Sequence, residues 1–520
     1  MFTMPSCDES QPFLTDEEKL SNAESTATLV PSAPTSPRLD GWLNAQVDVQ
    51  TQLLWFLQRP TRWLRADFLP SLLPMPLNAK ARSAFLGERV SSTAWLDGMR
   101  GLASLFVFIR HYSSAWHQNI QSGFGANGSN HYIPLLPFIR LVIQGPAMLS
   151  VFFLVSGYAL SWGPLKALTE RDGTDKCLRK LVSATFRRPI RLFLPGLCST
   201  FIIMLCVSAG LYDRGELAAT EELMPGFHEP QPPMLEGFEA QMAEWWRCTK
   251  DFVNVWNLDN HCYDAHLWTL NVEFRYSMAL FMTICALVRT HVVGRVAGLL
   301  GMVVYCQWEN SWEGWSFFAG ALLVQINLLS YSGENDDVEE LPLPTARISE
   351  TKLRWLEERG GSPERIAMFV LALYLLSMPD YASSAPGYRT LAAFSPPTWG
   401  ESWRFWHGIG SLLLLWTSAH STFLQQLFTN PLSRYFGKLS YALYLMHGPV
   451  VHMLGYWLVP WCQDHVSGRG NVWQREFGFA LASVVVVAAT VWAADLFWTV
   501  CNKGSVRLAR WIEGWVMKRD

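Results

Sequence analysis

The sequence has few charged residues for a chain of 520. Asp, Glu, Lys and Arg make up 16% of it, whereas half of the residues are hydrophobic. Soluble proteins carry about a quarter charged residues, so a soluble multidomain protein is excluded. The formal net charge is −3, which gives no basic excess for binding nucleic acid. The composition instead predicts a protein that lies in the lipid bilayer.

Several short motifs are also missing. The ten cysteines include no Cys-x-x-Cys pair, which excludes a zinc module and a disulfide scaffold. No serine has the Gly-x-Ser-x-Gly frame of a hydrolase nucleophile, and no phosphate-binding Gly-x-x-x-x-Gly-Lys-Ser/Thr loop occurs. We therefore predict no metal site. The N-terminus lacks the basic start and apolar core of a signal peptide.

The chain divides into four predicted regions. Residues 1–50 are polar and rich in Ser, Thr, Pro and Glu, as expected of a disordered cytosolic tail. Residues 51–94 mix aromatic residues with Arg and Pro, a composition that suits an amphipathic segment on the membrane surface. Residues 95–501 form the transmembrane domain, and 502–520 form a basic cytosolic tail.

The transmembrane domain contains about ten apolar stretches, which predict an all-α, polytopic membrane protein with about ten transmembrane helices around a central cavity. Two of them, 296–307 and 366–378, are shorter than the ~20 residues that cross hydrocarbon, and must extend into their flanks, tilt or be re-entrant. The stretches are 95–116, 146–164, 192–212, 267–287, 296–307, 313–331, 366–378, 404–420, 436–458 and 476–500.

The Lys and Arg residues predict an orientation. Of the 41, 30 fall in the two termini and one set of alternate connections, and six fall in the other set. Cytosolic flanks accumulate basic residues, so both termini are predicted to be cytosolic, in an endomembrane such as the ER or Golgi. The acidic connection 213–265 then faces the lumen, with Cys248 and Cys262 as a candidate pair. The acceptor pattern for N-glycosylation at Asn127–Ser129 falls on the same side.

Charges inside apolar stretches are costly, and the first stretch contains Arg100 and His111. Their separation of eleven residues places them within about 20° on one helix face and roughly 16 Å apart along it. An extended thioester arm, anchored by phosphates at one end and reacting at the other, matches this spacing. A snorkelling arginine and a structural histidine are the alternative.

Five sequence blocks resemble the acyltransferase-3 family of integral membrane enzymes, which acylate hydroxyl groups, and the polar tail and acidic loop look most like fungal members. The family's Arg-x10-His hallmark is matched by Arg100 and His111. The other blocks follow in the family's order, and together the five cover about four fifths of the chain. They are Trp95–Ala103, Phe152–Tyr158, Arg188–Arg191, His266–Glu273 and Gly437–His447.

The resemblance implies an acyl-CoA donor, with acetyl-CoA the expected co-substrate, a hydroxyl-bearing acceptor and no tightly bound cofactor. His111 is the predicted general base, because it is an intramembrane histidine that shares a helix face with a cation. Glu273 is predicted to orient His111, or alternatively to pair with Arg100, Arg110 or Arg275. The run Val272–Arg275 departs from the family's block, because many relatives have a second carboxylate or Gln after the Glu, and this affects the hydrogen bonding expected around Glu273.

Arginine forks suit phosphate, so Arg100, Arg188 and Arg191 are predicted to bind the nucleotide end of the donor. Alternatively, Arg188 and Arg191 only fix the orientation of the protein in the membrane, as basic residues on cytosolic flanks do. The remaining residues of the blocks are predicted to line the substrate cavity, although His266 is also compatible with a helix cap and His447 with a structural role. These predicted cavity residues are Ser156, Tyr158, His266, Trp268 and His447.

Three classes of function remain. The best supported is an acyl-CoA-dependent O-acyltransferase that acts on a small molecule, secondary metabolite, lipid or glycan. The second is a transporter or flippase, in which Arg100, His111 and Glu273 form a substrate or proton path. The third is a membrane scaffold. The halves show no internal repeat of the kind found in transporters, and a scaffold needs no cation and histidine on one face.

Overall fold

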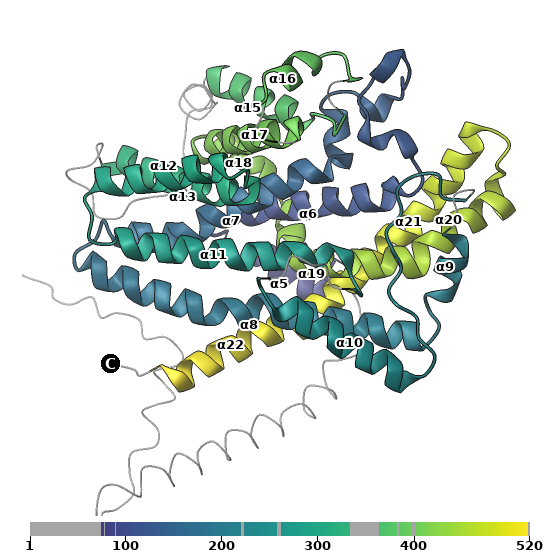
Figure 1. The fold of residues 1–520 in the computed structure, drawn as a ribbon, viewed down its shortest axis with the longest axis horizontal. Helices are drawn as coiled ribbons and strands as arrows, with labels where there is room; N and C mark the ends of the chain where they lie inside the picture. The colour runs from purple at the N-terminus through teal and green to yellow at the C-terminus, as the bar shows by residue number, and fades with distance from the viewer. Residues whose placement is uncertain are drawn as a thin grey trace, which may run out of the picture. The chain divides into compact units, whose positions relative to one another are not determined.

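The structure, a computed structural model, describes residues 74–76, 78–88, 90–219, 223–256, 262–332, 363–381, 384–396, 399 and 401–517. The predicted tail 1–50 and most of segment 51–94 lie outside the described residues. All regular elements in the described part are helices (Figure 1), which confirms the all-α prediction. The α-helices are α5 (Ala79–Gly87), α6 (Ala94–Ser114), α7 (Gly145–Ala167), α8 (Gly173–Ser208), α9 (Asp213–Ala218), α10 (Phe238–Val253), α11 (Trp268–Leu287), α12 (Val292–Trp308), α13 (Trp312–Ser332), α15 (Pro363–Leu376), α16 (Arg389–Ala393), α17 (Ser402–Ala419), α18 (Thr422–Thr429), α19 (Pro431–Val450), α20 (Tyr456–Cys462), α21 (Val472–Phe497) and α22 (Lys503–Val516).

The ten predicted apolar stretches all fall on helices. Both short stretches extend into their flanks, one as α12 from Val292 to Trp308 and the other as α15 from Pro363. Among the described residues, three helical segments are long and apolar enough to cross a membrane: Gly145–Ala167, Gly173–Ser208 and Val472–Val516. Ten crossings remain a prediction.

Helix α8 starts earlier than we expected. The connection predicted at 165–191 is mostly helical, because α8 begins at Gly173 and continues for 36 residues to Ser208. Arg188 and Arg191 therefore lie on a long helix and not in a loop. At 1.5 Å per residue, the helix is roughly 54 Å long, which is longer than the hydrocarbon layer is thick.

Glycines allow close contact between neighbouring helices in the core. A Cβ atom on Gly101 of α6 would lie 2.3 Å from the backbone nitrogen of Gly437 in α19. A Cβ on Gly157 of α7 would lie 2.1 Å from the carbonyl oxygen of Phe317 in α13. Small residues are how helices approach closely in membranes. The glycines of three family-like blocks thus have a packing role.

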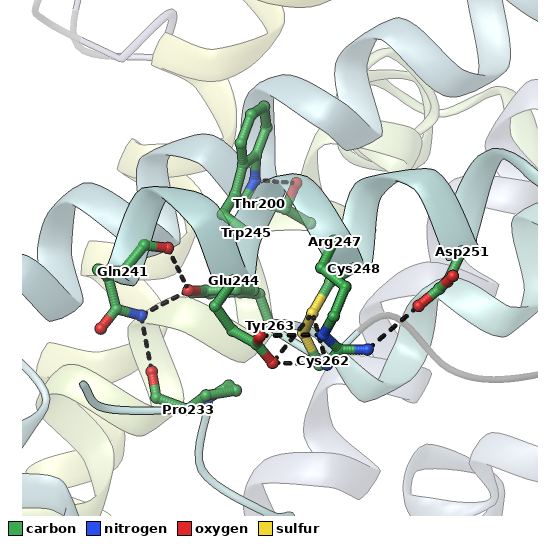
Figure 2. The surroundings of a disulfide bond; sticks show 10 residues. All are labelled: Thr200, Pro233, Gln241, Glu244, Trp245, Arg247, Cys248, Asp251, Cys262 and Tyr263. Carbon is green, nitrogen blue, oxygen red and sulfur yellow. Dashed lines mark hydrogen bonds and ion pairs between the residues drawn. A yellow bond between two sulfur atoms is a disulfide. The ribbon is translucent and has the colours of Figure 1, made fainter. Parts of the chain in front are cut away.

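A disulfide between Cys248 of α10 and Cys262 confirms the predicted pairing (Figure 2). Gln241, also on α10, donates from Nε2 to the carbonyl of Pro233 at 2.8 Å, and its Oε1 accepts from the amide of Leu235 at 2.9 Å. The same Nε2 donates to the hydroxyl of Tyr263, the residue that follows Cys262. Helix α10 is thereby hydrogen-bonded to two other segments of the chain, one at Pro233 and Leu235 and one at Tyr263.

The predicted basic tail is helical over most of its length. Residues 503–516 form α22, which packs against α8. Glu513 of α22 lies 3.3 Å from Nε of Arg187 and accepts a hydrogen bond from the hydroxyl of Ser183. Ser505 and Ala509 of the same helix are buried. This end of the chain is therefore part of the helical body.

Candidate active site

A cavity of about 430 Å³ lies among α6, α7, α8, α11, α19 and α22. Its lining includes Arg100 from α6 together with Arg188 and Arg191 from α8. The three arginines that we assigned to one ligand from the sequence therefore meet in one space. The guanidinium of Arg100 lies 4.9 Å from the ring centre of Phe152, which lines the same cavity.

One face of α6 leads from this cavity toward His111. Arg100, Ser104 and Val107 line the cavity in steps of four and three residues. His111 is four residues beyond Val107, so it continues this face one turn, or roughly 6 Å, further along the helix. Arg100 and His111 occupy the two ends of one stripe, in agreement with the register predicted from the sequence.

Three histidine rings meet at the far end of this stripe. His111 from α6, His266 from η5 (Ala265–Leu267) and His447 from α19 have ring centres 4.3 Å (His111–His266), 4.5 Å (His266–His447) and 5.4 Å (His111–His447) apart. Two cavity-lining residues adjoin this cluster: Tyr444 donates to the carbonyl of His266, and its hydroxyl is 2.6 Å from that of Thr269.

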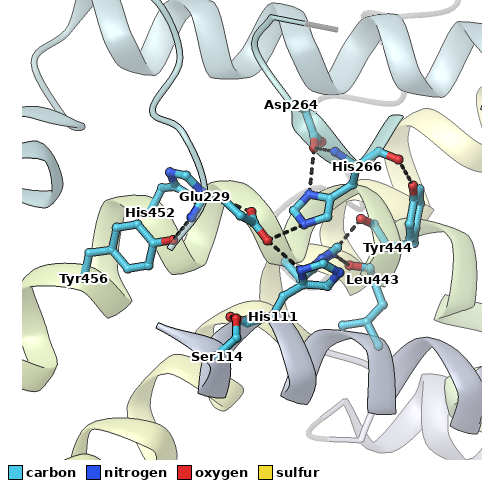
Figure 3. Close-up of polar contacts among 10 residues, drawn as sticks. His111, Ser114, Glu229, Asp264, His266, Leu443, Tyr444, His452 and Tyr456 are labelled. Carbon is cyan, nitrogen blue, oxygen red and sulfur yellow. Dashed lines mark hydrogen bonds and ion pairs between the residues drawn. The ribbon is translucent and has the colours of Figure 1, made fainter. Parts of the chain in front are cut away.

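Glu229 connects the histidines, and the sequence reasoning missed it. Its Oε1 lies 2.6 Å from Nδ1 of His111 and 2.8 Å from Nε2 of His266 (Figure 3). Its Oε2 lies 3.4 Å from Nε2 of His452, and its amide donates to the hydroxyl of Tyr456. One buried carboxylate is thus shared by three imidazoles. Glu229 was among eleven acidic residues of the connection 213–265, and its position just before Pro230 in a proline-rich stretch was the only local signal.

His266 lies between two carboxylates. Its Nδ1 is 2.8 Å from Asp264 Oδ1, on the side opposite Glu229. Burial alone would lower the pKa of His266, but Glu229 and Asp264 outweigh it and raise the pKa to about 10. In the same way, burial would raise the pKa of Glu229, but the charge of His266 and the hydrogen bonds from His266 and His111 hold it well below its ordinary value. At neutral pH His266 is therefore a cation and Glu229 an anion.

These charges fix the tautomer of His111. An ionised carboxylate only accepts hydrogen bonds, so Nδ1 of His111 carries the proton that points to Glu229, and the lone pair of a neutral ring is on Nε2. The His111 side chain is 31% exposed, compared with 7% for His266, and His447 as a residue is 1% exposed. Of the three rings, that of His111 is the most exposed.

Glu273 does not contact His111, contrary to the predicted pairing. Its Oε1 accepts from Nη2 of Arg188 at 2.6 Å and from the hydroxyl of Ser156 at 3.2 Å. The alternative of an arginine partner holds, although the partner is Arg188 and not Arg100, Arg110 or Arg275. Nε of Arg188 also donates to the hydroxyl of Ser277 at 3.1 Å. Glu273 and its neighbours thus fix one guanidinium at the cavity wall.

The other predicted cavity residues make contacts within the protein core. Ser156 holds Glu273, as described. Tyr158 is buried, accepts from Nδ2 of Asn327 at 3.3 Å and stacks on Trp162. Trp268 packs on the hydrophobic core. Contrary to the prediction, the lining of the 430 Å³ cavity includes none of the five residues Ser156, Tyr158, His266, Trp268 and His447. Nδ1 of His447 donates to the carbonyl of Tyr444 at 2.6 Å.

The three histidines also have the spacing of a metal site. One ring nitrogen from each lies within 4.8 Å of the others, and three histidines are a common ligand set for zinc. A ligating ring, however, needs a free lone pair. His266 is held in its cationic form, with both nitrogens directed at carboxylates. The charge arrangement suits proton transfer better than metal ligation.

Comparison with known proteins identifies the chain. Residues 93–499 match the acyltransferase domain of the acyltransferase-3 family. The chain belongs to this family. It is therefore an acyltransferase of an integral membrane family, as predicted. No solved structure matches it.

Three fungal relatives support this assignment. The O-acetyltransferase PaAT-1 of Phomopsis amygdali is 32% identical over 457 residues, which span 82% of this chain and 85% of that protein. The acyltransferase R4 of a Phoma species and the acyltransferase clz18 of Cochliobolus lunatus are each 23% identical, over 78% of this chain and 92% of either protein. The matched region contains all three histidines, Glu229 and the three predicted arginines.

Proposed function

We propose that this acyltransferase moves an acyl group from acyl-CoA to a hydroxyl of a small molecule, lipid or glycan, with His111 as general base. Acetyl is the proposed group, since the relative PaAT-1 is an O-acetyltransferase. The observation that carries the proposal is the accessible His111 ring, held by Glu229 one helical turn beyond a cavity that is lined by Arg100, Arg188 and Arg191.

The donor enters through the cation-lined cavity in this proposal. Arg100, Arg188 and Arg191 bind the phosphates of the nucleotide, and the pantetheine arm extends along α6 toward His111. The rise of roughly 16 Å between Arg100 and His111 suits an extended arm. Glu273 holds Arg188 in place and has no direct part in the chemistry. We revise its role from orienting the base to positioning the donor site.

The chemistry needs one proton transfer in each direction. Nε2 of His111 takes the proton from the acceptor hydroxyl as its oxygen attacks the thioester carbonyl. Glu229 stabilises the imidazolium that forms, because its carboxylate is already bonded to Nδ1. The tetrahedral intermediate then breaks its carbon–sulfur bond, and the imidazolium returns the proton to the leaving thiolate. The products are an ester and free coenzyme A.

The base role is tested by His111→Ala. We expect a loss of transfer of roughly 100-fold or more, because a general base contributes about that much, with unchanged binding of coenzyme A. The assay supplies labelled acetyl-CoA and an extract of the source cells to membranes that contain the enzyme, and follows the labelled product.

His117→Ala is the matched control. His117 lies six residues further on and contacts Glu476 and the carbonyl of Ser113, away from the cluster. Its loss should leave the rate unchanged. A His111→Ala enzyme that keeps more than about a tenth of the rate would exclude His111 as the base.

A further inference from the structure

Helix α22 contributes to the donor cavity, although it lies beyond the matched family region, which ends at residue 499. Lys503, Arg507 and Arg510 line the cavity from this helix. They are spaced by four and three residues and therefore share one face. Glu513, one turn beyond Arg510 on the same helix, contacts Arg187 and Ser183 and attaches α22 to α8.

The cavity has a large excess of positive charge. Among the residues that the structure describes, six cations line it, three on α22 and three on α6 and α8, and Glu273 is the one acidic side chain in this lining. That carboxylate already contacts Arg188 at 2.6 Å. Like charges gathered around a partly enclosed space repel one another and are costly unless an anion joins them. The arrangement therefore fits a ligand with several negative charges.

We propose that α22 is part of the donor-binding site, and that Lys503, Arg507 and Arg510 bind phosphate groups of acyl-CoA. This inference rests on the proposed function, since it takes the donor to be a coenzyme A thioester. Coenzyme A carries a diphosphate and a separate 3′-phosphate on its ribose, so its charges are spread over two places. One set of hydrogen-bond donors for phosphate is formed by Arg188 and Arg191 on α8. The cations of α22 form a second set.

Anchoring at the membrane surface is a different explanation for basic residues at this end of the chain. It draws on the same phosphate chemistry, supplied by a lipid headgroup. Two observations favour the nucleotide. The three cations line a cavity together with arginines from two other helices, and Ser505 and Val506 of α22 line it as well. A helix that serves only as a surface anchor has no need to complete a cavity.

The test is the double variant Arg507→Gln/Arg510→Gln in the full-length protein, reconstituted in neutral phosphatidylcholine nanodiscs. Binding of coenzyme A is measured by titration calorimetry, and the donor and acceptor KM by product formation. We expect Kd and donor KM to rise by about tenfold or more for each lost contact, with acceptor KM unchanged. Lysine replacements should recover part of the loss, because the charge remains without the fork.

Arg179→Gln is the matched control, since Arg179 is exposed on α8 and does not line the cavity. Equal coenzyme A affinity in the double variant and the wild type would overturn the role of α22 and leave the proposed function intact. Absence of coenzyme A binding in the wild type would instead overturn the proposed function. A variant that loses only its binding to phosphatidylserine-containing nanodiscs would assign α22 to lipid.

A second measurement needs no variant. Hydrogen exchange of the amides in 503–516 is followed in the wild-type protein with and without coenzyme A. Bound phosphates should slow exchange in α22, whereas 3′-dephospho-coenzyme A should give less protection. Unchanged exchange at saturating coenzyme A would contradict the proposal even if the double variant failed to fold.

Discussion

Glu229 is the residue on which the charges of the histidine cluster depend. It is buried, and it accepts hydrogen bonds from His111 and His266 through a single oxygen. A carboxylate in this position keeps one ring cationic and sets the tautomer of the other. A neutral amide of the same shape can still accept the hydrogen bonds, but it carries no charge to keep His266 cationic. The charge of Glu229, beyond its hydrogen bonds, is therefore expected to matter for catalysis.

Glu229→Gln should lower kcat by roughly 100-fold or more, because His111 loses the negative charge that stabilises its imidazolium form. Donor KM should stay near the wild-type value, since Glu229 is absent from the cavity that the donor fills. Glu236→Gln is the control, because Glu236 is exposed in the same segment. A rise in donor KM with an unchanged kcat would show that Glu229 does not act through His111.

The raised pKa of His266 predicts a stability that depends on pH. The pKa of His266 is about 10 in the folded protein, compared with 6.5 ordinarily. Its charge therefore stabilises the fold most below pH 6.5, and this contribution is lost as the pH rises through about 10. The groups that face it are Glu229, Asp264, His111 and His447.

Melting temperatures of the wild type and His266→Asn between pH 6 and 10.5 measure this effect. The wild type should lose more stability than the variant as the pH rises. Parallel curves for the two proteins would show that His266 is not charged in the fold.

At the scale of helices, the glycine contacts set how closely the core elements pack. Gly157 belongs to the Phe152–Tyr158 block, and its position against Phe317 leaves no space for a methyl group. The block's Ser156 holds Glu273, which in turn holds Arg188 at the cavity. A change in the packing of α7 against α13 would therefore displace Arg188 at the donor site as well as residues of the core.

Gly157→Ala should destabilise the protein by about 1–3 kcal/mol, the usual cost of forcing a methyl group into a filled core. Gly301→Ala is the control, because a Cβ at Gly301 of α12 meets nothing within 4 Å. That variant should be neutral or more stable by up to about 1 kcal/mol, since alanine favours helices. Melting in detergent separates the two, and equal melting temperatures would exclude a packing role for Gly157.

The sequence predicted those parts of the site that depend on local spacing. Arg100 and His111 share a helix, so the helical repeat alone was sufficient to place them on one stripe. Glu229 is 118 residues from His111 and reaches it from an irregular segment, for which no periodicity exists. Arg188 and Glu273 are 85 residues apart, and their pairing depends on how α8 and α11 pack. We predicted a tail for the residues of α22, because a short basic stretch of sequence does not indicate which helix it packs against.

At the scale of the whole molecule, the proposed path for the acyl group joins two chemically different ends. Cations gather around the cavity, whereas the histidines and two carboxylates form the other end of the α6 stripe. The Lys and Arg distribution predicts that the connections around 165–191 and 332–365 face the cytosol and that 213–265 faces the opposite side. On that prediction the donor enters from the cytosol, where acyl-CoA is made.

The disulfide makes the histidine end sensitive to redox conditions. The Cys248–Cys262 disulfide should stabilise the folded protein by roughly 3 kcal/mol, as expected for a loop of this length. It also fixes α10, which is hydrogen-bonded to Pro233, close to Glu229 in the sequence, and to Tyr263, close to His266. Dithiothreitol, or the double variant Cys248→Ser/Cys262→Ser, should therefore lower kcat and leave coenzyme A binding intact. Cys285→Ser, at an exposed free cysteine, should change neither, and a reduced enzyme of full activity would contradict the link. On this prediction the enzyme matures only where thiols are oxidised, and its activity would report the thiol–disulfide balance of the compartment that the loop faces.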